Sequence, residues 1–230
     1  MEHKLQVKKA LVSGASSGIG LSIVKHLLKL GWMVTALSRN RPDLEHDNLT
    51  FIAIDLSQDD FRHELTGLSG FDAIICAAGM MKTDPIATLQ PKDGELMWRL
   101  HVLAPIQIVN TLVPSMKDKG RIILIGSRTA NGAANRSQYA ASKSALIGLS
   151  RSWAIELLPR HITVNIISPG ATETPMLLNP ARKMTPPKVP PMGRFIQPIE
   201  IAGTVEFLLS DYAMSITGQN IVICGGGSLS

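Results

Sequence analysis

A tyrosine and a lysine four residues apart form a candidate acid–base pair, Tyr139 and Lys143. They lie near the start of a predicted helix, Ser137–Leu158, where residues at this spacing share one face. A free tyrosine titrates near ~10, and an adjacent cation lowers that pKa by about 1–3 units, towards the range useful for general acid–base catalysis. A tyrosine and a lysine at this spacing also occur by chance on solvent-exposed helices. The neighbouring motifs must therefore show whether the pair is catalytic.

A serine at the end of a predicted strand supplies a third polar group. Ser127 follows the apolar run Arg121–Ile125. The carboxyl ends of parallel strands form the edge at which open α/β sheets bind ligands. We therefore predict that the Ser127 hydroxyl holds a substrate carbonyl, with capping of the next turn as the alternative.

A glycine-rich turn leads from the first predicted strand directly into a helix. The segment Ser13-Gly-Ala-Ser-Ser-Gly-Ile-Gly20 places glycines at 14, 18 and 20. Glycines allow close backbone approach, and a helix N-terminus offers unpaired N–H groups and a positive dipole end to a pyrophosphate. An ordinary strand-to-helix turn is the alternative. The predicted phosphate-binding residues are Gly14, Ser16, Ser17, Gly18, Ile19 and Gly20.

The end of the second predicted strand bears on cofactor choice. In dinucleotide folds an acidic residue there binds the ribose hydroxyls of NAD, whereas this chain has Ser38 and Arg39. A guanidinium can form a charge-assisted fork with a 2′-phosphate, and Ser38 adds a donor. NADP(H) is the predicted cofactor. Asp55 and Leu56 are placed to reach the adenine, although an aspartate there can also cap a helix.

Apolar runs of strand length alternate with helical patterns, which predicts a doubly wound Rossmann-type α/β fold with a seven-stranded, mostly parallel sheet and helices on both faces. One domain spans residues 1–230. The predicted strands are Ala10–Ser13, Met33–Leu37, Leu49–Ile54, Ala73–Cys76, Arg121–Ile125, Thr163–Ile167 and Asn220–Ile223. The other predicted helices are Gly18–Leu30 and Asp93–Met116, the latter with a possible kink at Pro105. The segment 175–195, rich in proline, is predicted to be a surface loop that serves as a substrate lid.

Taken in order, these motifs resemble the short-chain dehydrogenase/reductase family over nearly the whole chain. Ala78-Gly79 and Ser168-Pro-Gly170 belong to the same family pattern. Pro191–Phe195, with Gly218-Gln219 and Gly225-Gly226 of the tail, resembles its β-ketoacyl-carrier-protein reductase branch. The resemblance implies hydride transfer between nicotinamide and a ketone or secondary alcohol, with catalysis by Ser127, Tyr139 and Lys143. It implies further cofactor contacts from Ala77, Ala78, Gly79, Tyr139, Lys143, Pro169, Gly170, Thr172 and Thr174, with Ile167 beside the ring.

Three positions depart from the family pattern. Cys76-Ala77 stands where the family has two asparagines, Cys224 where it has an aspartate, and His101 where it has a helical asparagine. That asparagine holds a water that relays protons to the lysine. We therefore predict that neutral His101 bonds the relay water, with simple packing as the alternative.

The overall composition narrows the function class. The net charge of +5 is scattered rather than clustered, which argues against nucleic-acid binding. No apolar stretch reaches the ~20 residues of a membrane span, two cysteines make a disulfide framework unexpected, and we predict no metal. The polar start, Met1 to Lys9, favours a cytoplasmic protein. The resemblance implies a homodimer or homotetramer paired through helices carrying Trp98 and Trp153.

Two functions from different classes remain open at the level of sequence. The first is an oxidoreductase with a small carbonyl or alcohol substrate. The second is a catalytically impaired NADP-binding regulatory or structural protein, which would explain the absent asparagine but gives no reason for Ser127, Tyr139 and Lys143 to occur together. Enoyl reductases of the family space the tyrosine and lysine more widely, so they match less well.

Overall fold

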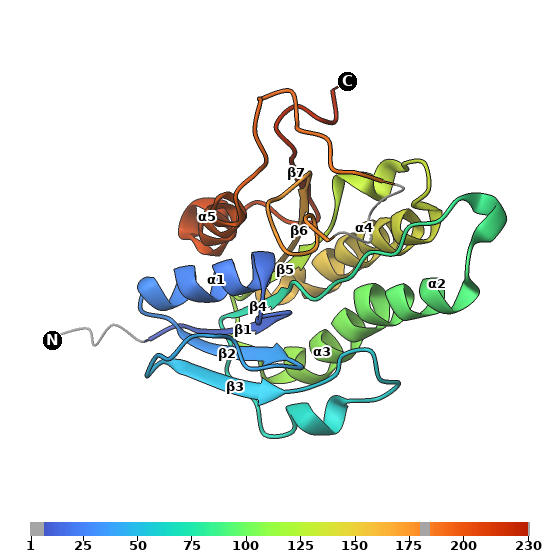
Figure 1. The fold of residues 1–230 in the computed structure, drawn as a ribbon. Coiled ribbons are helices and arrows are strands. Elements are labelled where there is room, and N and C mark those ends of the chain that lie inside the picture. Colours follow the sequence, from blue (N-terminus) through green and yellow to red (C-terminus); the bar gives the residue numbers. More distant parts are fainter. Residues whose placement is uncertain (1–6, 180–184, 230) are drawn as a thin grey trace, which may run out of the picture.

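The computed structural model describes residues 7–179 and 185–229, which are built around one parallel sheet (Figure 1). Seven strands lie in the order β3-β2-β1-β4-β5-β6-β7, and every pairing is parallel. The strands are β1 Lys9–Ser13, β2 Met33–Ser38, β3 Leu49–Ala53, β4 Ala73–Cys76, β5 Arg121–Ile125, β6 Thr163–Pro169 and β7 Asn220–Ile223. The doubly wound fold is thereby confirmed, with an entirely parallel sheet instead of a mostly parallel one.

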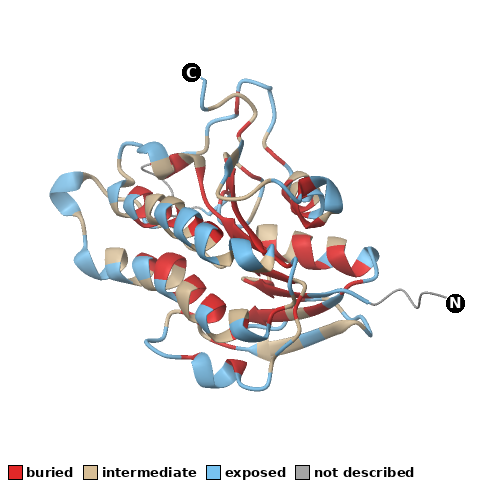
Figure 2. Ribbon diagram, turned by 180° about the vertical axis from the view of Figure 1, so that it is seen from behind, coloured by how far each residue is buried: buried red, intermediate tan, exposed pale blue. Residues whose placement is uncertain are grey.

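Helices cover both faces of this sheet (Figure 1). They are α1 Gly18–Lys29, α2 Pro91–Trp98, α3 Ala104–Leu112, α4 Ser137–Leu157 and α5 Pro198–Leu209. One core cluster packs Ile23 of α1 and Val205 of α5 against the sheet. The other packs Ile108 of α3 and Leu146 of α4 against the opposite face. The central strands are accordingly buried (Figure 2), which is why they read as continuous apolar runs.

The chain reverses its direction of travel across the sheet between β1 and β4, which are neighbours. Loops that leave two such strands diverge and open a crevice at the carboxyl edge. Here the strand ends are tied together because the Ser13 hydroxyl oxygen accepts hydrogen bonds from the backbone N–H of Ala77 at 3.1 Å and of Ala78 at 3.3 Å. The crevice therefore has a rigid floor.

The seven predicted strands are all present, with ends that move by two residues at most. The largest change is in β6, which runs on to Pro169 because it continues to pair with β7 as far as Ile223. The predicted helix Gly18–Leu30 ends at Lys29 and Ser137–Leu158 ends at Leu157.

The predicted helix Asp93–Met116 is wrong in detail, because it is interrupted. Between α2 and α3 the segment Arg99–Leu103 forms a π-helical turn. Pro105 has no backbone N–H, so the carbonyl of His101 loses its usual partner four residues on, and a local change of helical register follows. Single π turns of this kind occur often at functional sites.

The combined helical run Pro91–Ser115 is long and apolar enough to pass as a membrane span by length and composition, contrary to the expectation from sequence. Its residues Ala104, Ile108 and Leu112 are buried against the sheet. A core helix of a folded domain gives the same signal, so the run is explained by packing.

Helix α5 was not predicted. It begins at Pro198, and the backbone N–H of Gln197 donates to the Glu200 carboxylate at 2.7 Å. Proline at the first helical position and a glutamate in the first turn are helix-start signals. These signals come directly after the proline-rich segment 175–195, which was predicted to be a loop.

Candidate active site

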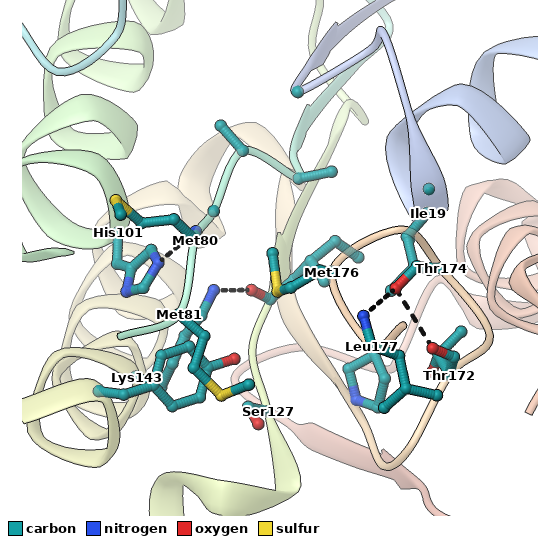
Figure 3. Close-up of a pocket in the computed structure, with 18 of the residues that line it drawn as sticks. Ile19, Met80, Met81, His101, Ser127, Lys143, Thr172, Thr174, Met176 and Leu177 are labelled. Atoms are coloured by element: carbon teal, nitrogen blue, oxygen red, sulfur yellow. Dashed lines mark hydrogen bonds between the residues drawn. The ribbon is translucent and has the colours of Figure 1, made fainter. Parts of the chain in front are cut away.

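A cavity of about 740 Å³ opens at the carboxyl edge of the sheet, and all of the predicted site residues except Ile167 line it. Figure 3 shows part of this lining. They are Gly14, Ser16, Ser17, Gly18, Ile19, Gly20, Ser38, Arg39, Asp55, Leu56, Ala77, Ala78, Gly79, Ser127, Tyr139, Lys143, Pro169, Gly170, Thr172 and Thr174. Residues far apart in sequence therefore share one cavity, as the predicted fold requires.

The glycine turn is packed so tightly that side chains are excluded. A Cβ at Gly14 would lie 2.7 Å from the Ala78 backbone, and one at Gly20 would lie 2.1 Å from the Gly14 carbonyl. Gly18 has φ +55°, and a Cβ there would meet the Thr174 side chain at 3.3 Å. The loops after β1, β4 and β6 thus converge where α1 begins.

The N-terminus of α1 is left without a charged or side-chain partner. Its first turn carries no acidic residue, and its N-cap residue, Ser17, forms no side-chain cap with any described residue. Its free N–H groups and positive dipole end face the cavity, which is the arrangement that binds a phosphate. The cradle therefore fits the pyrophosphate of a dinucleotide.

At the other end of the cavity lie the residues predicted to contact the adenosine. Arg39 is exposed on the rim. The Ser38 hydroxyl, predicted to donate to a phosphate, instead donates to the Asn40 carbonyl at 2.8 Å. That part of the prediction is corrected, because the short turn after β2 uses the donor itself.

Asp55 has a second local role. Its Oδ1 accepts from the Ser57 hydroxyl at 2.7 Å and from the Ser57 backbone N–H at 3.0 Å. These two bonds, helped by nearby Arg39, hold the pKa of Asp55 below its usual value. The carboxylate caps a turn rather than a helix, and Oδ2 is not used in these bonds.

Lys143 lies buried at the centre of the cavity. Its ammonium donates a hydrogen bond to the Ile125 carbonyl at 2.7 Å, at the end of β5 (Figure 3). Burial disfavours the charged form and lowers the pKa of Lys143 to about 8. The neighbouring Cys76 is a neutral thiol, because burial raises its pKa to about 12 although Lys143 acts in the opposite direction.

Ser127 has the capping role that was the alternative prediction, and it also lines the cavity. Its oxygen accepts from the Thr129 backbone N–H at 3.1 Å and so caps the short helix Arg128–Asn131. Since an accepting oxygen keeps its own proton, the hydroxyl can still donate into the cavity, which it lines.

Tyr139 is buried, and its ring meets the His101 ring edge-on at a centroid distance of 5.5 Å.

His101 does not hold a relay water, and this prediction was wrong. Its Nε2 accepts from the Met80 backbone N–H at 3.1 Å, and its Nδ1 lies 2.9 Å from the Ser142 hydroxyl. That hydroxyl donates to the Tyr139 carbonyl at 2.9 Å, so it must accept from Nδ1–H. Both ring nitrogens are thus used by the protein. Burial, and secondly Lys143, lower the pKa of His101 well below 6.5, so the ring is neutral.

Two other sequence assignments change. Ile167, expected beside the nicotinamide, is fully buried in the core cluster under α1 and α5 and does not line the cavity. Successive residues of a strand point to opposite faces, and this side chain points away from the site. Arg41, whose role was open, is exposed and also lies outside the lining.

Other lining residues were not predicted from sequence. Apolar ones come from the loop after β4 and from the α2 region, and polar ones from the loops before α4. They include Met80, Met81, Leu96, Leu100, Arg128, Asn135 and Arg136. Met176 and Lys188 also line the cavity and belong to the predicted lid segment 175–195. The one sequence signal for any of them was the position of Arg128 and Arg136 between Ser127 and Tyr139.

Within residues 7–179 and 185–229 no three His, Cys, Asp or Glu side chains form a metal-binding group.

Comparisons with known proteins agree with this geometry. Residues 14–228 match the family model described as Enoyl-(Acyl carrier protein) reductase. The chain is 31% identical to 3-oxoacyl-[acyl-carrier-protein] reductase of Rickettsia conorii, over 95% of this chain and 96% of that protein.

Two solved structures are similar as well. A blue fluorescent protein from a metagenomic library in complex with NADPH is 29% identical, with a TM-score of 0.83 over 96% of this chain and 97% of that one. A 4-hydroxyisoleucine dehydrogenase complexed with NADH is 30% identical, with a TM-score of 0.84 over 97% and 99% of the two chains. This chain belongs to the short-chain dehydrogenase/reductase family, whose members are nicotinamide-dependent oxidoreductases of alcohols and carbonyl compounds.

The environment of His101 predicts a pH dependence of stability. Its folded-state pKa lies below the unfolded value of about 6.5, so the unfolded chain binds more protons between those two values. The free energy of unfolding should therefore fall as pH falls below about 6.5, with a contribution of up to about 1.4 kcal/mol per pH unit. Denaturant unfolding across this range measures it.

The decisive comparison is the slope in His101→Asn, which should be smaller by about one proton. Gln58→Asn, at an exposed position whose side chain does not titrate, is the control and should keep the wild-type slope. Equal slopes in wild type and His101→Asn would show that His101 titrates as a solvated histidine.

Proposed function

We propose that this protein is an NADP(H)-dependent oxidoreductase that transfers a hydride between nicotinamide and a ketone or secondary alcohol, with Tyr139 as general acid and base. One observation carries the proposal. The buried Lys143, with Tyr139 and Ser127, lines the same cavity as the glycine cradle at the start of α1.

The cofactor would lie across the carboxyl edge of the sheet. The turn from Gly14 to Gly20 would hold the pyrophosphate, and Asp55 with Leu56 would contact the adenine. Ala77, Ala78 and Gly79 line the wall between those ends, and the nicotinamide half would rest against Pro169, Gly170, Thr172 and Thr174, with Tyr139 and Lys143 at its ribose. When bound, the nicotinamide supplies or accepts the hydride.

The protein's own residues would handle the proton. The Ser127 hydroxyl donates to the substrate oxygen and so polarises the carbonyl. Tyr139 transfers its proton to that oxygen in reduction and removes it in oxidation. Lys143, with a pKa of about 8, is mainly protonated at neutral pH and would stabilise the phenolate that forms.

The preference for NADP(H) rests on the end of β2. Arg39 lines the cavity next to Ser38, and no acidic residue stands at this point to repel a 2′-phosphate. Since Ser38 donates to Asn40, the guanidinium is the principal phosphate donor in this proposal. The two related structures hold different cofactors, NADPH in one and NADH in the other. The cofactor preference of this chain must therefore be inferred from its own residues.

The alternative of an impaired NADP-binding protein is less well supported. His101 differs from the family residue, but it connects Met80 to Ser142 without displacing Tyr139 or Lys143 from the cavity. Ketone reduction is also favoured over reduction of an enoyl bond, because Tyr139 and Lys143 keep the four-residue spacing.

The remaining expectations follow as part of the proposal. The chain forms one catalytic unit of residues 1–230, and segment 175–195 acts as a lid. Parts of that segment, Pro175–Leu177 and Thr185–Lys188, line the cavity, while residues 180–184 lie outside the described structure.

The oligomeric state and the localisation are proposed from individual side chains. Half-exposed Trp98, together with Trp153, suits pairing of helices into a homodimer or homotetramer. Two buried free cysteines suit a reducing cytoplasm.

Replacing Arg39 with Asp should weaken NADPH binding at least tenfold and shift the preference towards NADH. The reason is that a charged hydrogen bond contributes about 1.5–3 kcal/mol, or roughly ten- to a hundredfold in affinity. Fluorescence titration of both cofactors measures the change. Arg41→Asp, at an exposed position outside the cavity, should change neither affinity by as much. Equal affinity of the wild type for NADPH and NADH would contradict the proposed selectivity.

Tyr139→Phe should lower kcat on a good ketone by about 10²–10⁴ while NADPH affinity stays nearly intact, because only the proton-transferring hydroxyl is removed. NADPH oxidation followed optically, with a cofactor titration in parallel, separates the two effects. Tyr212→Phe at a 91% exposed site is the control and should keep full turnover. If Tyr139→Phe also did so, Tyr139 would not be the general acid and base of the reaction.

A further inference from the structure

The cavity carries a marked excess of positive charge. Its described lining holds the cations Arg39, Arg128, Arg136, Lys143 and Lys188. Among the described lining residues Asp55 is the one carboxylate, and it is held by Ser57 beside Arg39. Arg39 faces the proposed 2′-phosphate, and Lys143 serves the proton chemistry. The other three cations have no role in the proposed cofactor site.

Arg128 and Arg136 flank the proposed catalytic residues. Arg128 follows Ser127 directly, and its guanidinium donates to the Gly227 carbonyl at 2.8 Å. Arg136 stands immediately before α4, three residues ahead of Tyr139. The two guanidiniums are close enough for Arg128 to disfavour the charge on Arg136, whereas Tyr139 favours it. The positive charge thus lies where the reacting carbonyl has to be bound.

Among the described residues, the Arg136 side chain has no hydrogen-bond or ion-pair partner. Its Nε is buried, and no described residue accepts a hydrogen bond from it. Asp84 lies close in the backbone, since its N–H donates to the Asn135 carbonyl at 3.0 Å. However, Asp84 does not line the cavity, and in the described parts of the chain no carboxylate forms an ion pair with Arg136.

A buried guanidinium nitrogen without a partner is costly, because its lost hydration is not replaced. Burial accordingly lowers the pKa of Arg136 below its usual value, and Arg128 adds to the effect. A bound anion would remove this cost. A guanidinium fork matches the geometry of both carboxylate and phosphate oxygens.

We propose that Arg136 binds an anionic group of the substrate, a carboxylate or a phosphate, and that the enzyme acts on anionic ketones and the corresponding hydroxy compounds. Arg128 and Lys188 line the same cavity and add to the attraction, and Met80 and Met81 provide apolar surface for the carbon chain. This inference rests on the proposed function and names its substrate class.

Matched pairs of ketones test the inference. The first set is 2-oxobutanoate, 3-oxobutanoate, 4-oxopentanoate and 5-oxohexanoate, each against its methyl ester. Dihydroxyacetone phosphate against dihydroxyacetone separates a phosphate site from a carboxylate site. With NADPH, at least one anion should exceed its neutral partner in kcat/KM by about tenfold or more.

Arg136→Gln should reduce that ratio of anion to neutral compound towards one, and Arg136→Lys should retain part of it, because the charge remains while the fork is lost. The control is Lys92→Gln, at an exposed site outside the cavity, which should keep the wild-type ratio. A ratio near one for every wild-type pair, or an unchanged ratio in Arg136→Gln, would overturn the inference.

Thermal stabilisation in the presence of NADP⁺ gives a second readout that needs no turnover. The preferred anion should raise the melting temperature of the wild type more than its ester does, and Arg136→Gln should abolish the difference. Stabilisation without reduction of any ketone would support the anion site but refute the oxidoreductase. Reduction of neutral ketones without any preference for anions would refute the anion site alone.

Discussion

The buried ammonium of Lys143 is the constraint on which the rest of the site depends. Taking an ammonium group out of water costs several kcal/mol, which only well-placed partners offset. The Ile125 carbonyl is one such partner, 2.7 Å away at the end of β5. Helix α4 must therefore lie against that strand end, and this placement also brings Tyr139 into the cavity. The same ammonium is one reason that the buried His101 ring is neutral.

A chain of hydrogen bonds fixes α4 relative to the loop after β4. Met80 donates to His101, His101 to Ser142, and Ser142 to the Tyr139 carbonyl. The π turn places His101 between loop and helix. Where the family has an asparagine, this chain has a histidine whose two ring nitrogens are both bonded to other residues of the protein.

Much of the architecture could be predicted because buried parallel strands and a glycine turn leave direct traces in sequence. The strands β4, β5 and β7 were predicted to the residue, and Gly14, Gly18 and Gly20 lie where loops make contact. Helix α5 was missed although Pro198 and Glu200 mark its start. Ile167 was misassigned because a continuously apolar strand gives no sign of which face each residue occupies.

The partners of polar side chains were harder to predict, since they depend on contacts across loops. Sequence could identify His101 as unusual, but not that the Met80 N–H would occupy its Nε2. It could not single out Arg136 either, because the loop before α4 has no periodicity, and a guanidinium without a partner is recognised only once its neighbours are known.

Lys143 is a buried cation whose pKa is brought closer to neutral pH by desolvation. Lysine side-chain NMR of the full chain, with the signal assigned by its loss in Lys143→Arg, measures this pKa directly. We expect a midpoint of about 8 for Lys143, well below the reference of about 10.4 for solvated lysines. Titration of Lys143 together with the surface lysines would contradict it.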